Sequence, residues 1–132
     1  MDSGPMLLQD WVSLCGSADD TTAVTFYPHR SKWAWLGAAQ GVLAVVEVKE
    51  LAGVEGHLPT LRIETSADES GPWEAVSSIT TVSDTTIVLR RAPGGTASQT
   101  LRGFLRWAVA ETAGGGDWRI TFRISGVVEA AG

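Results

Sequence analysis

The sequence is poor in the residue types that most often carry chemistry. Its 132 residues include one cysteine, Cys15, and two histidines, His29 and His57, which stand far apart along the chain. One cysteine cannot close an internal disulfide, so we expect synthesis inside a cell rather than a disulfide-stapled secreted domain. No metal-ligand spacing joins the histidines, and no local base accompanies the thiol. We therefore predict surface-loop histidines, a small, partly buried cysteine, no cofactor, no metal centre and no enzymatic activity.

Long hydrophobic runs are missing as well. The longest mainly apolar stretch, residues 33–48, is interrupted by Gln40 and two glycines and is shorter than the roughly 20 residues of a membrane helix. Residues 1–17 contain Asp2 and Asp10 and have no positively charged start, which indicates that no secretory signal is present. We expect no membrane partner.

The chain also has no excess of positive charge. It contains 10 Lys and Arg against 15 Asp and Glu, for a net charge of −5. Nucleic-acid binding depends on clustered cationic side chains that neutralise phosphates, so we expect no nucleic-acid partner. The chain does have a globular composition, with 44% hydrophobic and 19% charged residues over a length typical of one domain. We predict a single domain over residues 1–132.

Alternation of apolar and polar residues is the strongest positive signal. In residues 118–128, Trp118, Ile120, Phe122 and Ile124 share one face of an expected strand, and arginines and a threonine occupy the other. This pattern predicts a half-buried strand. Related patterns predict strands at residues 22–28, 41–51, 60–66, 85–91 and 103–111, and weaker ones near residues 6–14 and 73–79.

Stretches rich in Gly, Pro, Asp and Ser separate the expected strands and are typical of turns. Many short strands without a long helical period indicate an all-β, antiparallel fold. We predict a single antiparallel β-sandwich, jelly-roll-like, with about eight strands. Residues 97–112 also contain helix-forming residues, so a helix is an alternative there, although Gly103 interrupts it.

An acidic turn follows the expected strand at residues 60–66. Asp68 can bond its own backbone and Gly71 can adopt positive φ, which together would reverse the chain. Trp73 would then re-enter the core and fix the hairpin register. The same turn offers oxygen ligands for a weak calcium site, but it has neither the alternating ligands nor the distant bidentate glutamate of a calcium loop. We interpret Asp68, Gly71 and Trp73 as a structural turn.

Six tryptophans are many for a chain of this length. Tryptophan serves both in cores and at the centres of protein interfaces. Residues 1–40 show poorer alternation than the remainder, so we expect a less regular N-terminal part that is a candidate interface segment. Trp11, Trp33 and Trp35 are our candidates for contacts between subunits, with stacking on sugar rings as the alternative.

Residues 41–128 contain a series of motifs in a fixed order. They are an L-x-I-x-x-S-x-D-x-x-G-x-W unit at 61–73, an R-x-φ-L-R-W strand at 102–107, a Gly-rich loop at 114–116 and a φ-T-F-x-I-S-G strand at 120–126. In this combination the chain resembles small β-sandwich structural proteins of tailed bacteriophages. A similar S-x-D-G-x-x-W turn occurs in discoidin-like carbohydrate-binding sandwiches, although Glu69 and Ser70 here separate Asp68 from Gly71.

The bacteriophage resemblance implies a non-enzymatic virion protein, made in the bacterial host cytoplasm. Capsid decoration or cement is the first expected role, and head-tail connector or tail component is the second. The expected partners are identical subunits and other virion proteins of the capsid or tail. The discoidin-like resemblance implies the alternative, a carbohydrate-binding module, and an enzyme is a third hypothesis.

Overall fold

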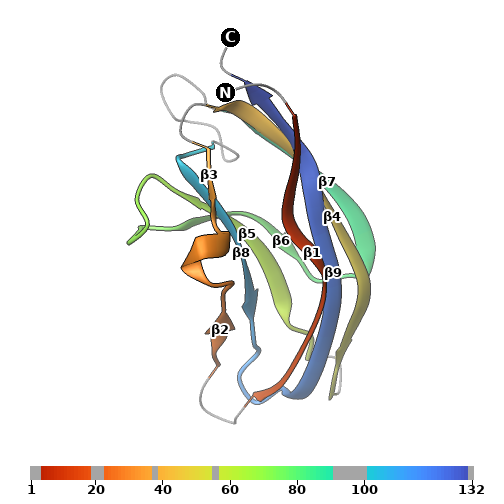
Figure 1. Ribbon diagram of the computed structural model, residues 1–132. Helices are drawn as coiled ribbons and strands as arrows, with labels where there is room; N and C mark the ends of the chain where they lie inside the picture. The colour runs from red at the N-terminus through yellow and green to blue at the C-terminus, as the bar shows by residue number, and fades with distance from the viewer. Residues whose placement is uncertain (1–3, 19–22, 37–38, 55–56, 91–100, 131–132) are drawn as a thin grey trace.

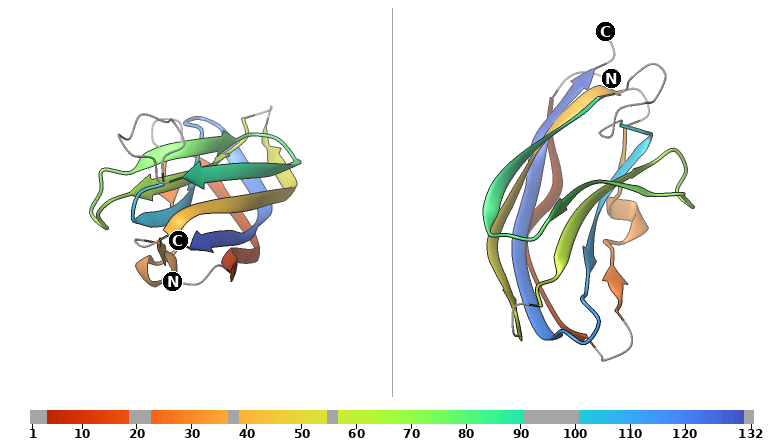
Figure 2. Two further views of the ribbon diagram at one scale, coloured as in Figure 1. Left: turned by 90° about the horizontal axis from the view of Figure 1, so that it is seen from above. Right: turned by 180° about the vertical axis from the view of Figure 1, so that it is seen from behind.

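Two antiparallel sheets packed face to face make up the protein in a computed structural model, which describes residues 4–18, 23–36, 39–54, 57–90 and 101–130 (Figures 1 and 2). The expected all-β sandwich is confirmed. Within these ranges there is one short 3₁₀ helix, η1 (Arg30–Lys32), and no helix is long and apolar enough to span a membrane. The strands are β1 (Gly4–Ala18), β2 (Thr25–Phe26), β3 (Ala34–Trp35), β4 (Ala39–Gly53), β5 (Thr60–Ser66), β6 (Glu74–Ile79), β7 (Ser83–Arg90), β8 (Phe104–Ala110) and β9 (Gly116–Ala130).

The strand order is that of a jelly roll. Sheet A has the order β1-β9-β4-β7, and sheet B has the order β2-β8-β5-β6, with β3 also paired to β8. Because β2 and β3 pair with opposite ends of β8, they act as one interrupted strand. When β2 and β3 are counted as one strand, the chain has eight strands, which we number 1 to 8 in chain order. Their order is then 1-8-3-6 in sheet A and 2-7-4-5 in sheet B, the double Greek-key arrangement of jelly rolls.

The core lies between the sheets, where alternate residues of the strands meet. Trp118, Ile120, Phe122 and Ile124 of β9 are all buried, as their alternation predicted. The Trp107 ring of β8 packs edge-on against Phe122, with 5.1 Å between the ring centroids. This contact joins the central strands of the two sheets.

The helical alternative for residues 97–112 is wrong where the structure describes that segment. Residues 104–110 form β8, which lies in the middle of sheet B with β5 on one side and β2 and β3 on the other. Leu105, Trp107 and Val109 alternate into the core, and pairing on both sides supplies partners for the backbone of this buried strand. Residues 97–100 lie outside the described residues.

The start of the N-terminal part is more regular than we expected, whereas residues 23–36 contain only the short elements β2, η1 and β3. Residues 4–18 form the long strand β1, which pairs with β9 along its length. Leu8 is buried, and the Trp107 indole N–H donates to the Gln9 side chain at 3.0 Å. Two register shifts, between Leu7 and Gln9 and between Gln9 and Val12, interrupt the alternation. These bulges explain why the strand pattern is weak in the sequence.

Candidate interaction surfaces

The outer face of sheet B carries a buried ion pair. Arg106 of β8 and Glu64 of β5 are cross-strand neighbours, and the Arg106 Nε atom lies 2.9 Å from Glu64 Oε1. Both side chains are more than nine-tenths buried, although both belong to the outward-facing rows of their strands. Arg62 Nε is 3.6 Å from the other carboxylate oxygen. A pair so well shielded from water needs further groups to cover it.

Three aromatic rings supply that cover. The Arg106 guanidinium carbon lies 4.0 Å from the centroid of Tyr27, 4.8 Å from that of Trp33 and 3.8 Å from that of Trp73. Trp33 and Trp73 also meet each other edge-on, with centroids 5.0 Å apart. We call these three rings the aromatic cage. Its occupant is the protein's own arginine, so the cage fastens residues 27–33 to sheet B by cation–π contact.

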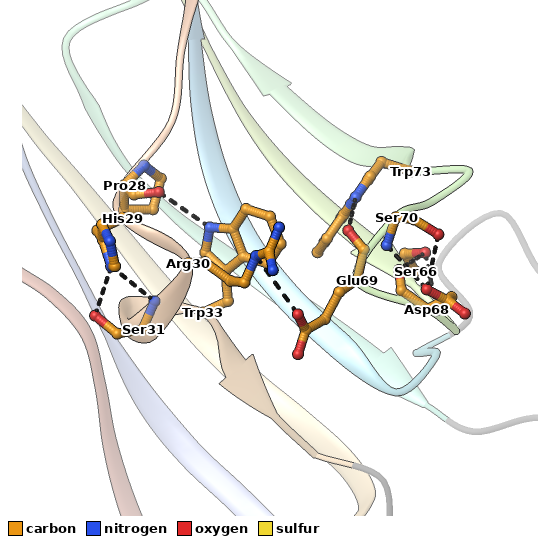
Figure 3. Close-up of polar contacts among 10 residues, drawn as sticks. All are labelled: Pro28, His29, Arg30, Ser31, Trp33, Ser66, Asp68, Glu69, Ser70 and Trp73. Carbon is orange, nitrogen blue, oxygen red and sulfur yellow. Dashed lines mark hydrogen bonds and ion pairs between the residues drawn. The ribbon is translucent and has the colours of Figure 1, made fainter.

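An ion pair joins η1 to the acidic turn, and local hydrogen bonds hold the two indoles on either side of it (Figure 3). The Trp33 indole N–H donates to the Pro28 carbonyl at 3.1 Å, and the Trp73 indole N–H donates to the Glu69 carbonyl at 3.3 Å. The Arg30 guanidinium lies 3.5 Å from the Glu69 carboxylate, an exposed ion pair. Segments about 40 residues apart in the chain therefore meet over the aromatic cage.

The acidic turn is built from local hydrogen bonds. Asp68 Oδ1 accepts from the Ser70 amide at 2.9 Å and from the Ser70 hydroxyl at 2.8 Å. These two bonds hold the pKa of the Asp68 carboxyl below its ordinary value, the amide contributing most. The Gly71 amide donates to the Asp68 carbonyl, and Gly71 has a φ of +93°, a conformation that L side chains rarely adopt. Within the described residues, no three His, Cys, Asp or Glu side chains gather where they would hold a metal.

The structure places Trp73 differently from our expectation and sets the three candidate interface tryptophans at separate positions. Trp73 lies on the outer face of sheet B, in the cage, and not in the core. Trp33 is also part of the cage and partly buried. Trp35 is 59% exposed and packs beside Phe104, with centroids 4.6 Å apart. Trp11 is on sheet A, where the Lys49 ammonium lies 5.7 Å from its ring. The three candidates therefore do not form one surface.

The thiol and the imidazoles are all on the surface. Cys15 is exposed, which corrects the expected partial burial: it occupies the outward-facing row of β1, opposite Arg119 of β9. His29 and His57 are exposed, as predicted. His29 accepts from the Ser31 amide through Nδ1 at 3.1 Å and so caps η1.

A surface that we did not predict lies on the outer face of sheet A. Val127 of β9 faces Leu43 of β4, which in turn faces Val88 of β7. Leu7 of β1 and Val45 of β4 flank Ser125 in the adjacent row. Leu7, Leu43, Val88 and Val127 are each exposed by 39% to 55%. We call these five apolar side chains the sheet A patch.

Charged residues border the sheet A patch at both ends. Arg90 and Glu129 form an ion pair, with 2.6 Å between nitrogen and oxygen, on either side of Gly41. At the other end, Arg123 Nε lies 3.9 Å from the Asp10 carboxylate. An apolar centre with a charged rim is the usual composition of a protein–protein contact surface.

Comparison with known proteins adds little to this description. No protein-family model and no curated protein match the chain. One similar solved structure, described as "Crystal structure of PirA", has 9% identity and a TM-score of 0.40, over 86% of this chain and 92% of that one. Another, described as "Bacillus endospore appendages form a novel family of disulfide-linked pili", has 19% identity and a TM-score of 0.38, over 93% and 89%. Likenesses this distant do not bear on function, and the bacteriophage resemblance rests on the sequence motifs alone.

Proposed function

We propose that this chain is a non-enzymatic structural protein of a bacteriophage particle, which acts through protein–protein contacts. The sheet A patch carries this proposal, because the solvent-facing side of an antiparallel sheet is normally polar. The motifs in residues 41–128 supply the virion setting through their resemblance to tailed-phage proteins. The particle's capsid or tail protein is the partner that we assign to the patch.

The patch is large enough to contribute to binding. Its four most exposed members are about half exposed, and fully burying such a side chain stabilises by about 1.5 to 3 kcal/mol relative to full exposure. Covering all four would therefore contribute roughly 3 to 6 kcal/mol before the costs of association. A contact of this strength suits a protein that binds a particle in many copies.

The buried charges also fit a structural role. Arg106 and Glu64 pair with each other beneath the aromatic cage, so they hold segments of the fold together and are covered from solvent. Buried ionisable groups at catalytic sites instead face a cleft that substrate can enter.

Capsid decoration or cementing is the first role that we propose, and a head-tail connector or tail component is the second. Negative-stain imaging of purified particles, combined with mass spectrometry of their proteins, tests the proposal. The chain should be present in stoichiometric amounts. Its absence from every particle would contradict a virion role.

A carbohydrate-binding function is a second candidate, and Trp35 favours it. One side of this ring packs so closely over Gly103 that an added Cβ would lie 2.3 Å from the ring, yet the side chain is 59% exposed. A rigid, exposed indole suits stacking against a sugar ring. A glycan array with wild type and a Trp35→Ala control tests this function. Binding by neither protein, with unchanged circular dichroism, would remove it.

A further inference from the structure

Strand β7 is the least protected sheet edge among the described strands. Proteins usually guard their edge strands with prolines, lysines, bulges or short length. At the opposite edge of sheet A, β1 contains Pro5 and two register shifts, and β2 and β3 have two residues each. In sheet B, β6 is a six-residue strand with a register shift in its pairing to β5. In contrast, β7 pairs with β4 in an unbroken register and contains neither proline nor lysine.

Among the described residues, no further strand pairs with the second side of β7. The strand pairs with β4 alone, at the margin of sheet A (Figures 1 and 2), and at its last residue the Arg90 carbonyl accepts from the Leu101 amide at 2.9 Å. An unpaired row of backbone N–H and C=O groups is a template for a further strand. The occupant of that position must therefore supply an extended segment.

We propose that the occupant is β7 of a second copy, paired antiparallel about a two-fold axis at Ile87. This register places Asp84 opposite Arg90 of the second copy, and Arg90 opposite the second copy's Asp84. The two strand ends thus carry opposite charges at matched positions, and Arg90 would contact both the second copy's Asp84 and Glu129 of its own copy. Thr86 faces Val88, and Ile87 faces itself. Residues that face each other across the pair lie on the same face of the sheet, because their numbers differ by an even count.

Both faces of the extended sheet remain consistent in this arrangement. Ile87 and Leu89 point into the sandwich core in each copy, so the apolar inner layer continues across the axis. Asp84, Thr86, Val88 and Arg90 are exposed on the outer side. Four strands from each copy would make one continuous sheet, and an isologous pairing of this kind closes as a dimer.

The dimer rests on the proposed function, because it specifies how a structural protein contacts its own copies. It also brings two sheet A patches side by side, since Val88 belongs both to β7 and to the patch. Two linked patches bind a repetitive particle surface more tightly than one. The β7 edge would thus mediate self-association, and the sheet A patch would mediate attachment to the particle.

Charge reversal tests the pairing and its register. Sedimentation velocity over a range of concentrations should show wild type as a reversible dimer. Asp84→Arg and Arg90→Asp should each weaken dimerisation roughly tenfold or more, because each change affects two symmetry-related pairs. The double variant Asp84→Arg/Arg90→Asp should restore the dimer. Asp10→Arg, the same charge change on the opposite edge strand β1, should have no effect on it.

The outcomes separate this inference from the proposed function. A wild type that stays monomeric at every concentration overturns the inference, even if the protein is found on particles. Single variants that dimerise as well as wild type, or a double variant that stays monomeric while folded by circular dichroism, also overturn it. A dimer with the expected charge dependence that is absent from all particles supports the pairing and refutes the virion role.

Discussion

The buried Arg106 guanidinium should be one of the most important polar groups for stability. Arg106→Ala removes the partner of Glu64 and leaves that carboxylate more than nine-tenths buried. Breaking one side of a buried ion pair costs about 3 to 5 kcal/mol. Loss of the cation–π contacts with the aromatic cage adds about 0.5 to 2 kcal/mol. Arg62, 3.6 Å from Glu64, offsets part of this cost, so we expect a loss of roughly 3 to 5 kcal/mol.

Urea denaturation followed by tryptophan fluorescence measures this loss, because Trp33 and Trp73 lie against the guanidinium. Arg30→Ala is the matched control: it removes an exposed arginine from an ion pair in the same region, and should cost less than about 1 kcal/mol.

The double variant Arg106→Met/Glu64→Gln isolates the ion pair. Because it leaves no unpaired buried carboxylate, and only the partly exposed Arg62 loses its partner, it should be more stable than Arg106→Met alone by at least about 1 kcal/mol. A stability loss in Arg106→Ala no larger than that in Arg30→Ala, or additive effects of the two substitutions in the double variant, would contradict a stabilising role for the buried ion pair.

Three further predictions concern the core, the turn and the N-terminal strand. Trp118→Ala should cost roughly 3 to 5 kcal/mol, the range for truncating a large buried aromatic, and an unchanged thermal melt would contradict the core position. Asp68→Asn should lower Tm at neutral pH, and its difference from wild type should shrink as the pH falls from about 4 through the lowered pKa of Asp68. The reason is that a carboxyl with a depressed pKa stabilises the fold while it is ionised and loses this effect as it becomes protonated. A difference in Tm that does not change with pH would show that the Ser70 bonds to the ionised carboxylate do not contribute. Deleting residues 1–18 should unfold the protein or cause it to aggregate, because β1 pairs with β9 and its loss exposes the β9 edge. A soluble monomer with native circular dichroism would show that β1 is dispensable.

Strands with regular alternation could be predicted from the sequence. Residues 60–66 form β5 with the expected bounds, and Trp118 to Ile124 point into the core as their spacing required. Both segments are central strands whose inner residues meet the opposite sheet, so local pattern and tertiary burial agree. The pattern of β1 is weak because its two bulges disturb the alternation around residues 9–11.

The outer surface of sheet B could not be predicted in the same way. Alternation says which residues share a face, but not which face is covered by a later or earlier segment. Trp33 and Arg106 are 73 positions apart, and their contact depends on how residues 27–33 cross β8. The alternation therefore predicts a core position for Trp73, whereas its ring lies on the outer face of sheet B against the buried Arg106 guanidinium.

The sheet A patch had a signal that we interpreted differently. Residues 42–46 are apolar on both faces, which is typical of a central strand buried on both sides. β4 is a central strand, but only one of its faces packs on the core. Leu43 and Val45 remain on the other face, and only the arrangement of the two sheets shows that nothing in the described structure covers them.

Attachment of a surface variant to particles tests directly whether the sheet A patch binds the particle. The measurement is the amount of a tagged chain that co-sediments with purified particles after expression during their production. Leu43→Lys/Val127→Lys places two charges in the sheet A patch and spares the core, so its melt should stay close to that of wild type. We expect wild type to co-sediment and this folded variant to be lost from the particles. Equal attachment of both proteins would contradict it.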